Sequence, residues 1–420
     1  MDSCFLFPNP NKEQIVDRPI VVVGAGQAAA SFISRHVALG SGTPLLLIGE
    51  ESVPPYHRPP LSKKYMSGEL ERERLFIRPE QWYPDQGIGT LFNTRIESID
   101  PVDKQVVTDS GDNIAYQKLL LCTGSSPHTL PEEIGGKLKG VYTLRNITDT
   151  ETMRPELQSG RKLLIIGGGY IGLEAAAVAR KLGLEVTVLE MADRILQRVA
   201  ARETSDFFRQ LHQGHSVDIR ESTQMVRFTE QAGRVSGAEL AGGDQLEADL
   251  VLVGIGVTPN TSLAEQAGLI CENGIVVSET CQTSEPDIYA AGDCTSFVRN
   301  GQRIRLESVQ NAANQGDLVA RVLADEQVVY DAIPWFWSDQ YDCKLQIAGL
   351  NVGYDQTVRR PGAKPEGQSI WYYGENRLIA VDAMNDPLAY AMGRKIIGTG
   401  SNPAPEQIAD PGVDLKSLVK

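Results

Sequence analysis

A glycine-rich turn near the start of the chain has the spacing that accommodates the phosphates of a dinucleotide. It follows the apolar run at 20–23, and its glycines are Gly24 and Gly26. The first glycine of such a turn lets the chain bend sharply out of a strand, and the second lets a pyrophosphate approach the backbone. The third position, here Ala29, must be small so that helix and strand pack closely. A helix that begins at this turn would offer free N–H groups and its positive dipole end to the phosphates.

A second turn with the same pattern begins at Gly167, after another apolar run. Its second glycine is Gly169 and its third small position is Gly172, with Tyr170 and Ile171 between them. Two ordinary glycine-rich turns of an α/β protein would not need the same context on both sides. The two copies therefore predict two dinucleotide-binding sites.

Each turn lies within the same series of elements. A helix-like segment follows, at 27–39 and at 170–182, and then a short apolar strand that ends on an acid. The acids are Glu50 and Glu190, which would accept hydrogen bonds from ribose hydroxyls. The chain therefore repeats one strand–helix–strand unit, from which nucleotide-binding parallel sheets are built.

The second acid bears on the choice of nicotinamide dinucleotide. A carboxylate at Glu190 would repel the 2′-phosphate of NADPH, and no Arg or Lys follows it directly. Arg194 is the next basic residue, and its side chain could still reach a 2′-phosphate, which would permit NADPH. The sequence therefore favours NADH over NADPH.

Three further strand ends belong to the same architecture. The run at 119–124 ends in a small-residue turn, and the run at 283–293 ends in Gly-Asp. Alone, Asp293 would more often be a turn or cap residue than a ligand, but its place after the repeated pattern favours contact with a ribityl hydroxyl. The turn at 254–259, which contains Gly256, marks the return of the chain from one nucleotide domain to the other.

Composition excludes several classes of protein. A chain of 420 residues is too long for one ordinary core, so two or three domains are expected. The formal net charge is -14, which argues against non-specific binding to nucleic acid or anionic membrane. No apolar run has the length of a membrane span, and the apolar run at 4–7 is too short for a signal peptide, so a cytoplasmic protein is expected.

Six cysteines are scattered along the chain without a CxxC pair or a zinc-like cluster, at positions 4, 122, 271, 281, 294 and 343. They are expected to be free and mostly buried thiols.

Four segments resemble a known family. They are Pro59-Pro-Leu-Ser-Lys63, the turn at 167–174, Glu307-Ser-Val-Gln-Asn311 and Pro334-Trp-Phe-Trp-Ser-Asp-Gln340. Over about 19–397 the chain resembles the FAD-dependent ferredoxin reductases that serve bacterial cytochrome P450 and Rieske oxygenase systems. These putidaredoxin-reductase-like proteins are a branch of the glutathione-reductase superfamily. The glycine motifs alone identify only the superfamily, whereas the last two segments are specific to the narrower family.

The resemblance implies an α/β fold of two Rossmann-like dinucleotide-binding domains and a C-terminal α/β domain. The FAD-binding domain is expected to be split into 1–125 and 251–328 by an inserted NAD-binding domain at 126–250. The C-terminal domain, 329–420, is expected to cover the flavin and to dock the partner.

The cofactor contacts of the family carry over to matching positions of this chain. The FAD contacts fall on Gly24, Gly26, Ala28, Glu50, Lys63, Ile96, Arg145, Asp293 and Val309. The NAD contacts fall on Gly167, Gly169, Tyr170, Ile171, Gly172, Glu174, Glu190 and Gly256. Ile96, Arg145 and Val309 rest on the resemblance alone.

Lys63 and Glu174 are the candidates for catalytic roles. Lys63 is expected to hold the reactive edge of the flavin and to steady negative charge on the reduced ring. A lysine beside Lys64 is, however, also typical of a solvated loop. Glu174 is expected near the nicotinamide, although the helix dipole alone also favours an acid near a helix N-terminus.

The resemblance implies hydride transfer from NADH to FAD, then one-electron transfers to a 2Fe-2S ferredoxin that feeds a P450 or Rieske oxygenase. Disulfide reductases of the superfamily carry cysteines soon after the first phosphate turn, but the stretch 24–63 contains none. Electrons must then leave the flavin without thiol chemistry. The alternatives are an NADH oxidase, a rubredoxin or small-molecule reductase and, ranked lowest, an interaction flavoprotein like apoptosis-inducing factor.

Trp335 and Trp337 are two positions apart, so both indoles share one face if the segment is extended. Aromatic residues generally pack in cores, whereas the resemblance implies a role in docking or electron exit. Partner ferredoxins of this kind are acidic, so docking requires local positive charge on this acidic chain. The candidates are Arg72, Arg74, Arg303, Arg305, Arg394 and Lys395.

Overall fold

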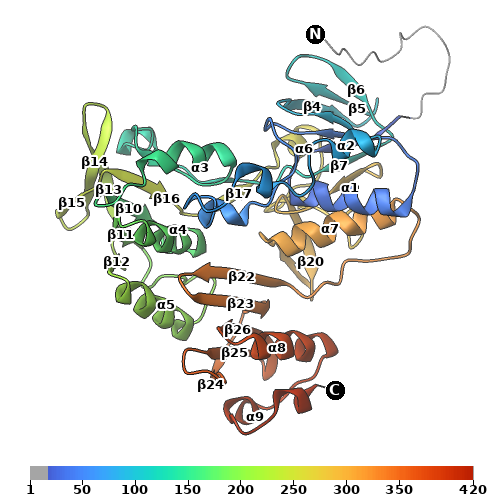
Figure 1. The fold of residues 1–420 in the computed structure, drawn as a ribbon. Coiled ribbons are helices and arrows are strands. Elements are labelled where there is room, and N and C mark those ends of the chain that lie inside the picture. The colour runs from blue at the N-terminus through green and yellow to red at the C-terminus, as the bar shows by residue number, and fades with distance from the viewer. Residues whose placement is uncertain (1–17, 420) are drawn as a thin grey trace, which may run out of the picture.

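The computed structural model describes residues 18–419 and contains two parallel five-stranded sheets followed by an antiparallel one (Figure 1). Within these residues, no helix combines the length and the apolar character needed to cross a bilayer. Each parallel sheet carries one of the two glycine-rich turns, and the antiparallel sheet belongs to the C-terminal part of the chain.

The sheet with the first turn, here called the first nucleotide sheet, is built from two separate stretches of chain. Its strands run parallel in the order β19-β7-β1-β2-β3. They are β1 (Ile20–Val23), β2 (Leu45–Ile48), β3 (Gly89–Leu91), β7 (Lys118–Leu121) and β19 (Ile288–Ala290). The predicted apolar runs β1 and β2 are buried along their whole length, as parallel strands covered on both faces must be. Because β19 joins this sheet, the chain leaves it after β7 and returns much later.

Two helices, α1 (Gln27–Leu39) and α7 (Val309–Val322), pack closely together beside this sheet (Figure 1). The predicted end of α1 at Gly40 is confirmed, because Gly40 is left-handed with a φ of 62°. The other elements of this part are α2 (Trp82–Asp85), β4 (Ile96–Asp100), β5 (Gln105–Thr108), β6 (Asn113–Ala115), α6 (Ser262–Gln266), β18 (Ile275–Val276), β20 (Thr295–Arg299) and β21 (Gln302–Ile304).

The sheet with the second turn, the second nucleotide sheet, has the strand order β12-β11-β10-β16-β9, also parallel. Its strands are β9 (Val141–Tyr142), β10 (Lys162–Ile166), β11 (Glu185–Leu189), β12 (Val217–Arg220) and β16 (Leu250–Val253). Its helices are α3 (Ile147–Met153), α4 (Tyr170–Lys181) and α5 (Arg202–Gly214). A small antiparallel sheet of β13 (Met225–Gln231), β14 (Arg234–Leu240) and β15 (Gln245–Glu247) lies beside it.

The two connections between the nucleotide sheets pair with each other. The outgoing strand β8 (Ser125–Pro127) forms an antiparallel pair with the returning strand β17 (Val257–Pro259). The expected domain boundary at 125 falls at the start of β8. The expected boundary at 250 falls on the first residue of β16, which hydrogen-bonds to β10 within the second nucleotide sheet.

The C-terminal part is an antiparallel sheet in the order β22-β23-β26-β25-β24, with β22 on one edge. Its strands are β22 (Trp335–Gln340), β23 (Cys343–Gly349), β24 (Gln356–Pro361), β25 (Gln368–Gly374) and β26 (Arg377–Met384). Helix α8 (Pro387–Thr399) packs on β23 and β26, and α9 (Pro405–Ala409) packs on β24. The edge strand β22 contacts both α4 and α7, so it touches both nucleotide-sheet units (Figure 1).

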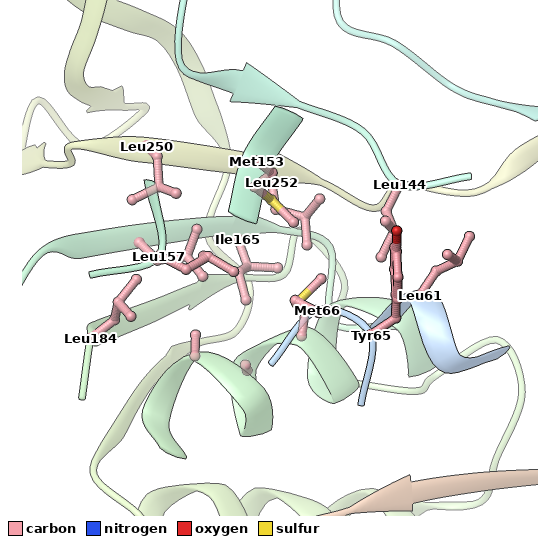
Figure 2. Close-up of a cluster of buried hydrophobic side chains, with 14 of the residues drawn as sticks. Leu61, Tyr65, Met66, Leu144, Met153, Leu157, Ile165, Leu184, Leu250 and Leu252 are labelled. Atoms are coloured by element: carbon pink, nitrogen blue, oxygen red, sulfur yellow. The ribbon is translucent and has the colours of Figure 1, made fainter. Parts of the chain in front are cut away.

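A buried cluster joins the segment around 53–75 to the second nucleotide sheet. Figure 2 shows Tyr65 and Met66 from this segment beside Ile165 of β10 and Leu252 of β16, and these side chains belong to one hydrophobic core. The segment includes the short 3-10 helix η1 (Pro59–Ser62), whose fixed proline φ angles favour a tight turn. This packing holds the residue after η1, Lys63, next to α4.

Candidate functional site

The first glycine-rich turn has the shape of a phosphate site. Gly24 has a φ of 103°, and a Cβ there would lie 2.2 Å from the carbonyl oxygen of Cys122, so only glycine fits. Gly26 is the N-cap of α1, with no side chain capping the free N–H groups. A Cβ at Gly26 would meet no protein atom within 4 Å. The space in front of the α1 N-terminus is therefore open, which fits a bound pyrophosphate.

The second turn repeats this geometry. Gly167 has a φ of 104°, and a Cβ there would lie 2.5 Å from the carbonyl oxygen of Gly254. A Cβ at Gly172 would lie 2.4 Å from the carbonyl oxygen of Gly167, which explains the small third position. Gly169 caps α4 without a side-chain hydrogen bond and, like its counterpart, has no protein atom within 4 Å of a Cβ. The two turns therefore offer the same open space in front of a helix N-terminus.

The two acids at the strand ends differ in their surroundings. Glu50 is exposed at the end of β2, and its carboxylate lies 3.5 Å from Arg95. The neighbouring Glu51 is instead bound by Arg58 at 2.7 Å and by the hydroxyl of Tyr56. Glu50 is thus the acid that remains accessible to a ribose.

Glu190 is fastened to the second turn itself. Its carboxylate accepts hydrogen bonds from the backbone N–H groups of Gly168 and Ala192, each at 2.8 Å. These bonds fix the carboxylate at the rim of the turn. Arg194, which left the route to NADPH open, is buried, and its guanidinium donates to the Ser205 hydroxyl and the Gln197 carbonyl. That guanidinium is therefore engaged inside the protein.

Three exposed apolar side chains surround the second turn. Ile171 lies in the first turn of α4, Met191 follows Glu190, and Ile255 lies in the facing loop. A Cβ at Gly167 would be 3.4 Å from the Ile255 side chain, so this loop lies directly against the turn. Apolar side chains exposed beside a phosphate site fit the planar rings of a dinucleotide. Gly256, another expected NAD contact, lies in the same loop with a φ of 110°.

Arg145 and Asp293, expected to contact the same cofactor, lie together in the structure. The Asp293 carboxylate accepts from the Arg145 guanidinium and from the Ser125 hydroxyl, both at 3.1 Å. The preceding Gly292 approaches Ala28, because a Cβ there would be 3.4 Å from the Ala28 methyl group. The end of β19 therefore lies beside the start of α1.

Three expected contacts can meet a cofactor only in limited ways. Ala28 and Ile96 are buried and their side chains pack in the hydrophobic cores, which leaves only backbone groups for contact with a cofactor. Val309 is the first residue of α7, half-buried, behind an N-cap made by Ser308. Because Ser308 accepts the Asn311 N–H, the remaining N–H groups of this helix end are available.

Lys63 and Glu174 form an ion pair with 2.6 Å between Nζ and Oε2. The Glu174 side chain is 5% exposed and that of Lys63 is 18% exposed. Glu174 also accepts from the Ser62 hydroxyl at 2.6 Å and the Ser338 hydroxyl at 2.7 Å. The solvated-loop interpretation is therefore wrong for Lys63, while the adjacent Lys64 is exposed. Residues from η1, α4 and β22 thus meet at one buried carboxylate.

No pattern in the sequence predicts the serine partners of Glu174. Ser62 and Ser338 belong to recognised segments, but they lie 112 and 164 positions from Glu174. Gln340, which ends the same recognised segment as Ser338, and His212 continue the hydrogen bonding, and His212 carries no local pattern that predicts a role. Only the packing of β22 against α4 brings these residues together.

The expectation that Trp335 and Trp337 share a face is confirmed. Both lie in β22, and their ring centroids are 5.5 Å apart. The Arg394 guanidinium lies 5.9 Å from the Trp335 ring, which gives this face positive charge. Phe336, on the other face, packs against Tyr170 of α4 at 5.0 Å. Strand β22 thus turns its tryptophans away from α4 and its alternate residues toward it.

The candidate docking cations differ in whether their side chains are already paired with an acid. Arg303 is paired with Glu272 at 2.9 Å, and Arg305 is bound to Glu307. Arg72 lies 3.8 Å from Glu151. Arg74, Arg394 and Lys395 are exposed.

The five described cysteines are free thiols, as predicted, and Cys4 lies outside the described residues. Burial raises the pKa of Cys122, Cys281 and Cys294 above that of an ordinary thiol. These thiols therefore stay protonated and are poor nucleophiles.

Two family models match the chain. One, described as pyridine nucleotide-disulphide oxidoreductase, matches residues 18–316, and the other, described as reductase C-terminal, matches residues 335–419.

Proteins of known name are similar over almost the whole length. The chain is 40% identical over 404 residues to a ferredoxin–NAD(P)+ reductase of a Sphingomonas species. The matched region covers 95% of this chain and 97% of that protein. It is 38% identical over 407 residues to putidaredoxin reductase of Pseudomonas putida, and this matched region covers 95% of this chain and 96% of that protein. The solved covalent complex of putidaredoxin reductase with putidaredoxin matches with a TM-score of 0.93 and 38% identity, covering 96% of this chain and 98% of that one. This structural match confirms the predicted fold class.

Proposed function

The chain belongs to the pyridine nucleotide-disulphide oxidoreductase family of FAD-dependent enzymes that use NAD(H), and we propose that it is an NADH-dependent ferredoxin reductase. The observation that carries the proposal is the buried Lys63–Glu174 ion pair. It connects the two nucleotide-sheet units, each of which has a glycine-rich turn with open space in front of a helix N-terminus. The stretch 24–63, which follows the first turn, has no cysteine. The overall reaction converts NADH and two oxidised ferredoxins into NAD+, two reduced ferredoxins and one proton.

We assign FAD to the first turn. Gly24 and Gly26 form its phosphate site, Glu50 is available to the ribose, and Asp293 with Arg145 lies at the adjoining strand end. Ala28, Ile96 and Val309 contribute backbone groups or, for Val309, a half-buried surface. When bound, FAD accepts a hydride and gives up electrons singly, which is chemistry that no side chain supplies.

We assign NADH to the second turn. Gly167, Gly169 and Gly172 allow the pyrophosphate to reach the α4 N-terminus, while Tyr170 and Ile171 begin that helix. Glu190, held on the turn by two backbone bonds, accepts ribose hydroxyls and disfavours a 2′-phosphate. The guanidinium of Arg194, the next basic residue in the sequence, is engaged within the protein and does not offset this carboxylate, and Gly256 lies in the facing loop.

Lys63 and Glu174 act where the two units meet. The buried Glu174 carboxylate holds the Lys63 ammonium in one place, and the ion pair and two serine hydroxyls compensate for the removal of that carboxylate from water. With FAD bound, an ammonium held here would stabilise negative charge on the reduced ring. Glu174, on α4, would lie on the side of the NADH turn.

We divide the chain into an FAD domain at 1–125 and 251–328, an NAD domain at 126–250 and a C-terminal docking domain at 329–420. The pairing of β16 with β10 supports moving the second boundary to follow residue 253.

We further propose that the protein works in the cytoplasm, where NADH is available and free thiols persist.

The face of β22 that points away from α4, where both tryptophans are half-buried, is the proposed docking surface for a 2Fe-2S ferredoxin. It carries Trp335 and Trp337, and Arg394 adds positive charge for an acidic partner. The matching complex of putidaredoxin reductase with its ferredoxin supports this kind of partner. A P450 or Rieske oxygenase would then receive electrons from the ferredoxin.

Replacing Trp337 by alanine should lower the rate of ferredoxin reduction about tenfold and the rate of ferricyanide reduction far less. Aromatic anchors contribute strongly to protein interfaces, whereas ferricyanide needs no docking face. Steady-state rates with both acceptors measure the difference. An equal fractional loss with both acceptors would exclude a docking role for Trp337.

The proposed function is tested by an anaerobic acceptor screen with NADH and NADPH. NADH should support rapid reduction of a 2Fe-2S ferredoxin, and NADPH should have a kcat/KM at least about tenfold lower. Rapid oxidation of NADH by O2 alone would instead indicate an oxidase. Preference for rubredoxin or a small quinone would indicate one of the other reductases.

A further inference from the structure

The hydrogen bonding of Glu174 continues beyond the ion pair into the interior of the C-terminal part. Ser338 donates to Glu174 Oε1 at 2.7 Å and accepts from the Gln340 side-chain amide at 3.1 Å. Gln340 Oε1 lies 2.7 Å from His212 Nε2. The side chains of Ser338, Gln340 and His212 are completely buried. A continuous polar chain therefore runs from α5 through β22 to α4.

The direction of every bond in this chain is determined by chemistry. The Glu174 carboxylate only accepts, so the Ser338 hydroxyl must donate to it and has a free lone pair for the Gln340 N–H. The Gln340 carbonyl oxygen must in turn accept from His212 Nε2–H. Burial lowers the pKa of His212 to about 4, so the imidazole is neutral. Its Nδ1 is then an acceptor, with the hydroxyl of Tyr341 at 3.4 Å. All donors thus point toward Glu174.

Ser338 has a role that the other two donors cannot fill. Lys63 and Ser62 both bond to Oε2 of Glu174, whereas Ser338 bonds to Oε1. Without Ser338, the second oxygen of a buried carboxylate would lose its hydrogen bond. The carboxylate would then rotate or shift, and the Lys63 ammonium would move with it.

We propose that Ser338, Gln340 and His212 are positioning residues for the Lys63–Glu174 pair. The inference rests on the proposed function, because it assumes that Lys63 acts on the flavin. Strand β22 then has two tasks on its two faces. One face holds Glu174 in place, and the other carries Trp335 and Trp337 toward the partner.

The chain suits positioning better than proton conduction. The amide of Gln340 links two bonds through different atoms and does not readily pass a proton between them. Loss of a link should therefore act through the placement of Lys63. A purely structural role is the competing explanation, and the two differ in what they predict for a protein that already lacks the Lys63 ammonium.

The first experiment compares Ser338→Ala, Gln340→Leu and His212→Leu in the FAD-loaded protein. The kcat for NADH-dependent ferricyanide reduction should fall about tenfold for Ser338→Ala and progressively less along the chain, with KM for NADH nearly unchanged. Ser338→Thr, which keeps the hydroxyl, should restore most of the rate. Gln356→Leu, at an exposed position of β24 on the opposite edge of the sheet, is the matched control and should behave like the wild type.

The second experiment adds Ser338→Ala to a Lys63→Met protein. Positioning predicts no further loss of kcat in this background, and a shift of the reduction potential of bound FAD that has the same sign in both single variants. A full additional tenfold loss in the double variant, or a wild-type rate for Ser338→Ala, would overturn the inference. A wild-type rate for Lys63→Met would overturn the proposed role of Lys63 as well, so the two failures are distinguishable.

Discussion

Gly26→Ala should leave the protein folded while lowering its affinity for FAD about 100-fold. A Cβ at this position meets no protein atom within 4 Å and points into the open space before the α1 N-terminus. The methyl group therefore costs the fold little, but it occupies the space through which the pyrophosphate approaches the backbone. FAD titration of the apoprotein gives the affinity, and thermal unfolding without cofactor gives the stability.

Two matched variants make this result specific. Gly169→Ala adds the same methyl group at the second turn, so it should retain FAD and raise KM for NADH by about 100-fold instead. Gly24→Ala should destabilise the apoprotein, because its Cβ would lie 2.2 Å from a backbone oxygen at a φ of 103°. If Gly26→Ala bound FAD like the wild type, or if Gly169→Ala lost FAD, the assignment of the two turns would be wrong.

The features that could be predicted from the sequence are those set by local sterics. The apolar runs form buried strands, and Gly24, Gly167 and Gly172 occur where a positive φ or a close backbone approach excludes any side chain. Even the shared face of Trp335 and Trp337 follows from the alternation of a strand. Each of these leaves a pattern within a few consecutive residues, so a short stretch of sequence is enough to predict it, although the atoms that crowd Gly24 and Gly167 come from distant strand ends.

The partners of Glu174 depend instead on packing between distant segments. Glu174 is buried because β22 and η1 cover α4, and neither contact has a spacing signal in the sequence. Arg194 shows the same limit, since only the fold reveals that its guanidinium is engaged by Ser205. Likewise, β16 joins the second nucleotide sheet through hydrogen bonds to β10 that its apolar sequence alone does not specify.

Lys63→Met should lower kcat about 100-fold with ferricyanide and with ferredoxin alike. The ammonium is the charged group that Glu174 holds between the two units, and its loss removes stabilisation of charge at the step that precedes both acceptors. Rapid mixing with NADH measures flavin reduction directly, and this step should show the same loss. The free energy of unfolding should also fall by about 3 kcal/mol, because Glu174 would remain buried without its counter-ion.

Lys64→Met is the matched control, because this neighbouring lysine is exposed and its replacement should change neither rate nor stability appreciably. Glu174→Gln separates charge from placement. The amide oxygen can still accept from Lys63 and Ser62, which share Oε2 of Glu174, so the fold should tolerate it better than an unpaired carboxylate. The ammonium would nevertheless lose its counter-charge and the rate should fall. If Lys63→Met reduced ferredoxin slowly but its flavin were reduced by NADH at the normal rate, Lys63 would act in electron transfer to the partner and not in hydride transfer.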